Sequence, residues 1–105
     1  SSVSNQGFPK LKKIEMWANK PQQINHKIIR AYLFLEKGGK VLLQNLNRIC
    51  SASDSKFYVG KNFKGNYASM KTDAGNSHGK VFYDIDGLVY VYPIVREEIR
   101  RWFGE

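Results

Sequence analysis

The chain has 105 residues, of which 42% are hydrophobic and 25% charged, and this size and balance predict one globular domain with a single hydrophobic core. Its 17 lysine and arginine residues outnumber nine acidic ones, and the net charge of +8 favours a polyanionic partner through long-range attraction. One cysteine excludes an internal disulfide, and the sequence has no apolar run of membrane-spanning length, so we expect a cytoplasmic protein without membrane contact.

The chain opens on a Ser-rich stretch. Residues 1–9 are expected to form a flexible N-terminal segment or a tag remnant, and residues 10–105 a single domain. The stretch "LKKIEMWANKP" predicts a short amphipathic helix that ends before Pro21. A longer helix follows in "PQQINHKIIRAYLFLEKGG", and its two glycines end it. The apolar stripe of this second helix consists of Ile24, Ile28, Ala31, Tyr32 and Leu35.

The middle of the chain predicts a short strand and two further helices. "KVLL" is long enough for one small strand, and "LLQNLNRICSAS" has its apolar residues at helical spacing. The helix predicted in "KNFKGNYASMKTD" is polar except for a narrow seam of Phe63, Tyr67 and Met70. "AGNSHG" has the composition of a loop.

The end of the chain predicts a β-hairpin and a closing helix. In "KVFYDIDGLVYVYP", two β-rich runs flank a tight turn around residues 84–87, and both faces of the hairpin are apolar. In "PIVREEIRRWFG", the spacing places Val95, Ile99 and Trp102 on one face, between an opening proline and a terminating glycine.

The order of elements between Ile24 and Tyr92, about two thirds of the chain, resembles the winged helix-turn-helix family. The matching segments are a first helix ("INHKIIRAYLFLEK"), a glycine turn and strand ("GGKVLL"), a second helix ("LQNLNRIC"), a polar third helix ("NFKGNYASMKT") and a two-stranded wing ("KVFYDIDGLVYVYP"). The resemblance implies a small α+β fold, with a helical core, a C-terminal β-hairpin wing and a closing helix. The chain also resembles the winged-helix modules attached to restriction-type nucleases.

The resemblance implies that the third helix enters the major groove of double-stranded DNA, in a non-enzymatic transcriptional regulator or DNA-targeting module. Lysine neutralises phosphates and reaches guanine acceptors, while asparagine pairs with an adenine edge. The local charge agrees, because the segment from Lys56 to Lys80 holds five lysines against one aspartate. The expected DNA-binding residues, on the third helix and at the base of the wing, are Lys61, Asn62, Lys64, Gly65, Asn66, Ser69, Lys71, Asn76, His78 and Lys80.

Two features of this region call for a physical reason. Gly65 costs about 1 kcal/mol in a helix relative to alanine. Close approach of the backbone to DNA is one reason for it, and a kink or a packing contact is another. Asp84 and Asp86 are expected to make the tip of the wing acidic, and phosphate would repel such a tip. We therefore expect the wing to contact DNA at its base, through His78 and Lys80.

Neither a metal nor a cofactor is expected, because the two histidines lie more than fifty residues apart and no glycine-rich phosphate loop follows a strand. No catalytic residue is assigned. His78 has only Asn76, Ser77 and Lys80 beside it, and Cys50 falls on the apolar side of a helix.

Two alternative functions remain open. One is a small basic ribonuclease of the bacterial toxin type, in which His78, Lys80, Lys71 and Tyr83 would form the site. The order of elements argues against it, since it offers no multi-stranded sheet to hold such a site. The other is a winged helix used for protein contacts, with a homodimer or another protein bound through the hairpin and the C-terminal helix.

Overall fold

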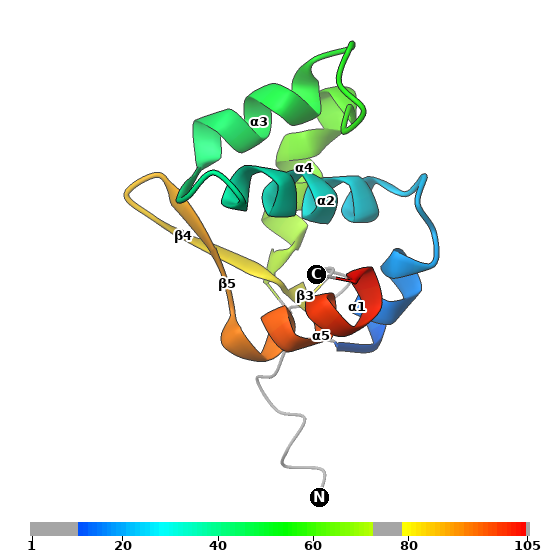
Figure 1. Ribbon diagram of the computed structural model, residues 1–105. Helices are drawn as coiled ribbons and strands as arrows, with labels where there is room; N and C mark the ends of the chain where they lie inside the picture. The colour runs from blue at the N-terminus through cyan, green and yellow to red at the C-terminus, as the bar shows by residue number, and fades with distance from the viewer. Residues whose placement is uncertain (1–10, 73–78, 105) are drawn as a thin grey trace, which may run out of the picture.

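A computed structural model describes residues 11–72 and 79–104. Within them the chain forms an α+β fold whose order of elements confirms the predicted fold class and is consistent with a small winged-helix-like fold (Figure 1). The elements are α1 (Leu11–Ala18), α2 (Ile24–Glu36), β1 (Val41–Leu42), α3 (Leu43–Ser51), the 3-10 helix η2 (Gly60–Asn62), α4 (Phe63–Ser69), β2 (Lys71–Thr72), β3 (Gly79–Lys80), β4 (Phe82–Ile85), β5 (Leu88–Val91) and α5 (Pro93–Phe103).

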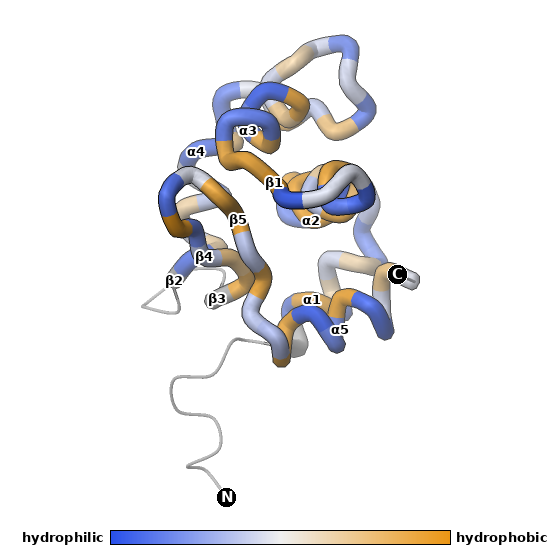
Figure 2. Tube along the Cα trace, turned by 60° about the vertical axis from the view of Figure 1, so that its left-hand side comes forward, coloured by the Kyte–Doolittle hydropathy of each residue, from blue (hydrophilic) through white to orange (hydrophobic). Residues whose placement is uncertain are grey.

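The helices pack in two groups around α2. α3 and α4 pack against α2, and α1 and α5 lie side by side at the opposite end of the molecule (Figure 1). Of the predicted apolar stripe of α2, Ile28, Ala31 and Tyr32 are buried, and Ile24 and Leu35 are partly buried. Ile29 and Leu33, which the stripe did not include, are buried as well. β1, almost wholly hydrophobic in Figure 2, contacts both α2 and α3. The core therefore lies between α2 and the elements that surround it.

The sheet has the antiparallel order β1-β5-β4, with Val41 opposite Val89 and Ile85 opposite Leu88. The hairpin turn thus consists of two residues, Asp86 and Gly87, at φ 53° and 82°. Both values are positive, as the tightest hairpin turns require, and an Asp-Gly pair is a preferred sequence for them. The backbone N–H of Leu43 donates a hydrogen bond to the Gly87 carbonyl at 2.7 Å, so the turn is fastened to the first residue of α3.

The second face of the hairpin is covered by its own aromatic rings. Phe82, Val89 and Val91 point into the core. On the other face the Tyr83 ring lies 5.3 Å from that of Tyr90 and 4.9 Å from that of Tyr92, measured between ring centroids, and all three side chains are partly buried. Mutual stacking of tyrosines reduces the apolar area left in water.

The buried face of α5 differs from the predicted one. Val95 and Ile99 are buried as expected, but the third position is Phe103, whereas Trp102 is 40% exposed. Spacing of four and four residues keeps Phe103 on the core side of the helix. Its ring meets that of His26, with the centroids 5.0 Å apart.

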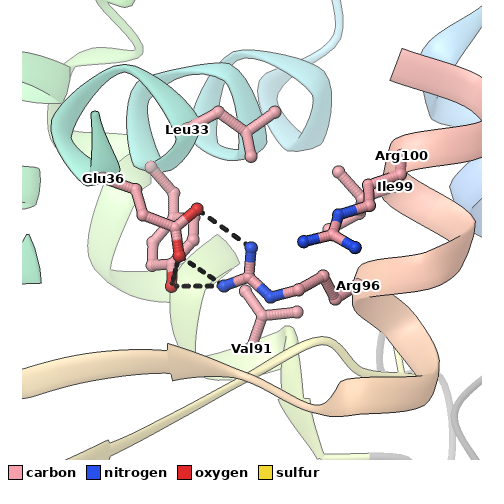
Figure 3. A pocket seen from close by; sticks show the side chains of 7 residues that line it. Leu33, Glu36, Val91, Arg96, Ile99 and Arg100 are labelled. Atoms are coloured by element: carbon pink, nitrogen blue, oxygen red, sulfur yellow. Dashed lines mark hydrogen bonds and ion pairs between the residues drawn. The ribbon is translucent and has the colours of Figure 1, made fainter. Parts of the chain in front are cut away.

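An ion pair links α5 to α2 (Figure 3). The guanidinium of Arg96 binds both carboxylate oxygens of Glu36 and donates to the Tyr32 hydroxyl at 3.2 Å. The hydrogen bond from Arg96 is the largest cause of a lowered pKa at Glu36, while burial raises the pKa of Tyr32 to about 12. The bonds among Arg96, Glu36 and Tyr32 hold α5 against α2.

Among the helices that the structure describes, none is both long and apolar enough to cross a membrane.

Candidate nucleic-acid interface

The predicted third helix is shorter than expected and consists of two parts. η2 covers Gly60–Asn62 and α4 covers Phe63–Ser69. The predicted seam is confirmed, since Phe63, Tyr67 and Met70 are all at most 4% exposed. Burial of this seam against α2, α3 and the hairpin fixes which side of α4 faces outward.

The outward side of the helix is basic and small. Lys61, Lys64, Gly65 and Ala68 are all exposed, and their spacing of three and four residues places them on one side. We call these four residues the α4 outer face. Among the ion pairs of the described residues, none includes Lys61 or Lys64. Both ammonium groups are therefore available to an external anion.

Gly65 lies on this face, and neither a close neighbour nor a positive φ requires glycine there. A Cβ built on it meets no atom within 4 Å. Its φ is not positive either, so alanine fits the same backbone. A packing contact within the described chain is therefore excluded as the reason for this glycine. Glycine costs about 1 kcal/mol here and leaves a stretch of helix backbone uncovered next to Lys61 and Lys64.

A second group of predicted residues lies on a different flank of α4. The side-chain amide of Asn66 donates to the backbone carbonyl of Asn62 at 3.1 Å, so part of its hydrogen-bonding capacity is used within the helix. Asn62 is exposed, whereas Asn66 and Ser69 are partly buried. These three residues adjoin the α4 outer face without belonging to it.

Lys71 is held by an internal partner. Its ammonium lies 3.0 Å from a carboxylate oxygen of Asp84 and 5.0 Å from the centre of the Tyr67 ring. The Tyr67 hydroxyl donates to the same oxygen at 2.8 Å. The hydrogen bond from Lys71, followed by that from Tyr67, lowers the pKa of Asp84, and burial raises the pKa of Tyr67. This triad joins the end of α4 to β4.

The prediction of an acidic wing tip that includes Asp84 is wrong. Asp84 lies inside β4, opposite Val89, and its charge is matched by Lys71. The turn itself holds one acidic residue, Asp86. The hairpin therefore opposes a nearby phosphate much less than the sequence implied.

Three elements enclose a groove beside the α4 outer face. It measures about 600 Å³ and lies between the start of α3, α4 and the hairpin turn. Lys64 belongs both to this groove and to the outer face. Gln44 and Asn47 were not predicted as site residues, although their spacing of three residues on the polar side of α3 was a usable signal. The lining residues are Leu42, Leu43, Gln44, Asn47, Phe63, Lys64, Tyr67, Ala68, Lys71, Asp86 and Gly87.

The remaining predicted residues come from the segment between β2 and β4. Asn76 and His78 lie outside the described residues. Lys80 lies in β3, where its backbone is opposite Lys71 in β2. The structure therefore joins the base of the hairpin directly to the end of α4.

Searches of protein-family models, curated proteins and solved structures find no match to this chain.

Three residues considered for catalysis, Cys50, Lys71 and Tyr83, are buried in the core or bound to neighbouring side chains. Burial raises the pKa of the Cys50 thiol to about 12, and the side chain is fully enclosed, so the reactive thiolate is not formed at neutral pH. Of the residues suggested for a ribonuclease, Lys71 is bound to Asp84 and Tyr83 is stacked against two other tyrosines. Both have packing roles that account for their presence.

Proposed function

We propose that this chain is a winged-helix module that binds double-stranded DNA through the α4 outer face and acts without catalysis, in the cytoplasm. The observation that carries the proposal is Gly65, an exposed helical glycine with nothing near its missing side chain and with two exposed lysines, Lys61 and Lys64, in the turn before it. The glycine lowers the stability of the helix, but it lets another molecule approach the helix backbone more closely than any other residue would.

The charges around Gly65 favour a polyanion as that molecule. Lys61 and Lys64 are exposed, and neither belongs to an ion pair in the described part of the chain. Lysine contacts to phosphate supply much of the affinity for duplex DNA and fix the register of the protein on it. Gln44 and Asn47 lie across the groove from Lys64, and their amides provide donors and acceptors for base edges.

The proposal predicts strongly salt-dependent binding that depends on the two free lysines. The test is a gel-shift titration with random duplex DNA at two salt concentrations, comparing the wild type with Lys61→Ala/Lys64→Ala. We expect weaker binding and a log–log salt slope that is smaller by roughly 0.9 for each phosphate that the variant no longer neutralises. Lys71 is left intact because its substitution would also break the bond to Asp84.

The matched control is Lys37→Ala/Lys40→Ala, which removes the same charge from two exposed lysines near the α2–β1 turn. A control that weakens binding as much as the α4 variant would mean that only total charge matters. Wild-type protein that fails to bind duplex at low salt would refute the proposal.

A second candidate function is protein contact, and a specific observation favours it. Ile94 and Trp102 of α5 are 42% and 40% exposed, and the stacked tyrosines lie on the adjacent hairpin. Exposed aromatic residues are enriched at protein interfaces. Light scattering coupled to gel filtration would detect a homodimer, and Trp102→Ala should return it to a monomer.

A further inference from the structure

A second basic surface lies on the outer side of α2. Lys27, Arg30 and Phe34 recur at spacings of three and four residues, which places them on one side of the helix. Ile28, Ile29 and Leu33, on the opposite sides, are buried. The loop after α3 adds the exposed Lys56 and, beneath it, the buried ring of Phe57, which lines the same pocket. We call Lys27, Arg30, Phe34, Lys56 and Phe57 the α2 patch.

The α2 patch contains a pocket of about 240 Å³ whose charged lining is entirely basic. The lining residues are Pro21, His26, Lys27, Arg30, Lys56 and Phe57. In residues 11–72 and 79–104, none of the three cationic side chains forms an ion pair with a carboxylate. The three cations repel one another, and an anion bound between them would offset this repulsion by attracting each of them.

Arg30 is held in place at this pocket by neutral and aromatic groups. Its Nε–H donates to Nε2 of His26 at 3.4 Å, and its guanidinium lies 5.1 Å from the centre of the Phe103 ring. Nδ1–H of His26 donates to the Trp17 carbonyl at 2.9 Å, which leaves Nε2 as the acceptor. These contacts use one edge and one face of the guanidinium and leave its terminal amino groups to other partners. Arg30 is therefore oriented without being neutralised.

An exposed aromatic ring adjoins the cations. Phe34 is 52% exposed, although it lies on a helix that is otherwise well packed. Its ring is 5.4 Å from that of Phe57, which lines the pocket, so Phe57 connects the exposed ring to the basic pocket. A cationic site beside an exposed aromatic face is the combination by which proteins hold a nucleotide of a single strand, with phosphate on the cations and base on the ring.

We propose that the α2 patch binds single-stranded nucleic acid, with a phosphate between Lys27, Arg30 and Lys56 and the attached base stacked on Phe34. Duplex DNA keeps its bases inside the helix, so it cannot use the exposed ring in this way. This proposal does not depend on duplex binding at the α4 outer face, because the two surfaces share no residue.

The test measures binding of a short fluorescent oligothymidylate to the full chain by anisotropy at two salt concentrations. Phe34→Leu removes the stacking face but keeps an apolar side chain, and we expect it to weaken binding about 5- to 100-fold without changing the salt slope. Lys27→Gln/Lys56→Gln should lower the salt slope by roughly 0.7 for each phosphate left without a lysine. Thermal denaturation of each variant confirms that it is folded.

The controls are Trp102→Leu, which replaces an exposed aromatic residue on α5, and Lys37→Gln/Lys40→Gln, which removes two lysines elsewhere. Both should bind oligothymidylate as the wild type does. The Lys61→Ala/Lys64→Ala variant should also keep this binding while its duplex binding weakens. The two proposals can therefore fail independently of each other.

Several outcomes would overturn the proposal. One is wild-type protein that does not bind oligothymidylate at low salt, and another is a Phe34→Leu variant that binds it with unchanged affinity. A titration with inorganic phosphate, followed by amide chemical shifts, separates the two sources of the anion. If phosphate alone shifts the signals of Lys27 and Lys56, and Phe34→Leu does not affect oligothymidylate binding, the patch is a phosphate site and the single-strand proposal is wrong.

Discussion

Replacing Gly65 with alanine should stabilise the fold and weaken DNA binding at the same time. The added methyl group meets no atom within 4 Å, and the backbone is outside the left-handed region, so no strain opposes the change. Alanine then recovers about 0.5–1 kcal/mol of helix propensity. For a domain of this size, that corresponds to a melting temperature higher by roughly 3–6 °C.

The same methyl group should obstruct the duplex. If DNA lies against the uncovered backbone at Gly65, beside Lys61 and Lys64, the methyl group prevents that close approach. We expect a loss of affinity of at least about tenfold, equivalent to about 1.4 kcal/mol. Thermal denaturation and a gel-shift titration with duplex DNA, made on the same preparation, measure both effects.

Ala68→Gly is the matched control. Ala68 is also exposed on α4, and its replacement by glycine removes bulk and lowers stability by about 0.5–1 kcal/mol. Because it removes a methyl group from the same α4 outer face and adds none, it should bind duplex DNA at least as tightly as the wild type. A Gly65→Ala variant that is more stable and binds DNA normally would show that no partner approaches this backbone. A destabilised Gly65→Ala variant would instead refute our account of the helix itself.

Three further predictions concern titratable groups. Burial lowers the pKa of His26 from 6.5, so the unfolded chain takes up the proton first as the pH falls. Urea unfolding should therefore give a free energy of unfolding that is constant above about pH 7 and declines below about pH 6.5. A flat profile between about pH 7.5 and 5.5 would contradict this. Asp84→Asn frees Lys71 and removes a negative charge beside α4, so gel shifts should show tighter DNA binding. The loss of the ion pair should lower the free energy of unfolding by less than about 1 kcal/mol. Weaker DNA binding would indicate that Tyr67, Lys71 and Asp84 together shape the interface. The Cys50 thiol is buried, and its pKa is raised to about 12. It should therefore react with a disulfide reagent only as fast as the protein unfolds. Rapid labelling of the native protein would show that the core opens at this position.

The arrangement of the core could be predicted from sequence periodicity. The seam of Phe63, Tyr67 and Met70 is buried, because a spacing of three and four residues leaves only one side of a helix for apolar groups. Periodicity failed at α5, where Trp102 and Phe103 are adjacent and both apolar. Only packing against His26 shows which of the two faces inward.

Features that join distant segments could not be predicted. Lys71 and Asp84 are separated by 13 residues and meet because the chain returns along β4 beside the end of α4. From the sequence alone, Lys71 looks like the other lysines of its segment, and Asp84 looks like a residue of the hairpin turn. The openness around Gly65 is likewise a property of its neighbours in space, which sequence order does not reveal.

The bond between Leu43 and the Gly87 carbonyl has a consequence for how the module would meet DNA. Together with the pairing of Val41 and Val89, it ties the hairpin to β1 and to the first residue of α3. Amide hydrogens at the start of α3 and in β5 should therefore exchange with solvent in one cooperative opening. If these contacts persist in a complex with DNA, the hairpin would keep its position and the duplex would make the adjustment. Flexible base-pair steps, which deform at low cost, would then bind better than stiff ones, even where no side chain touches them.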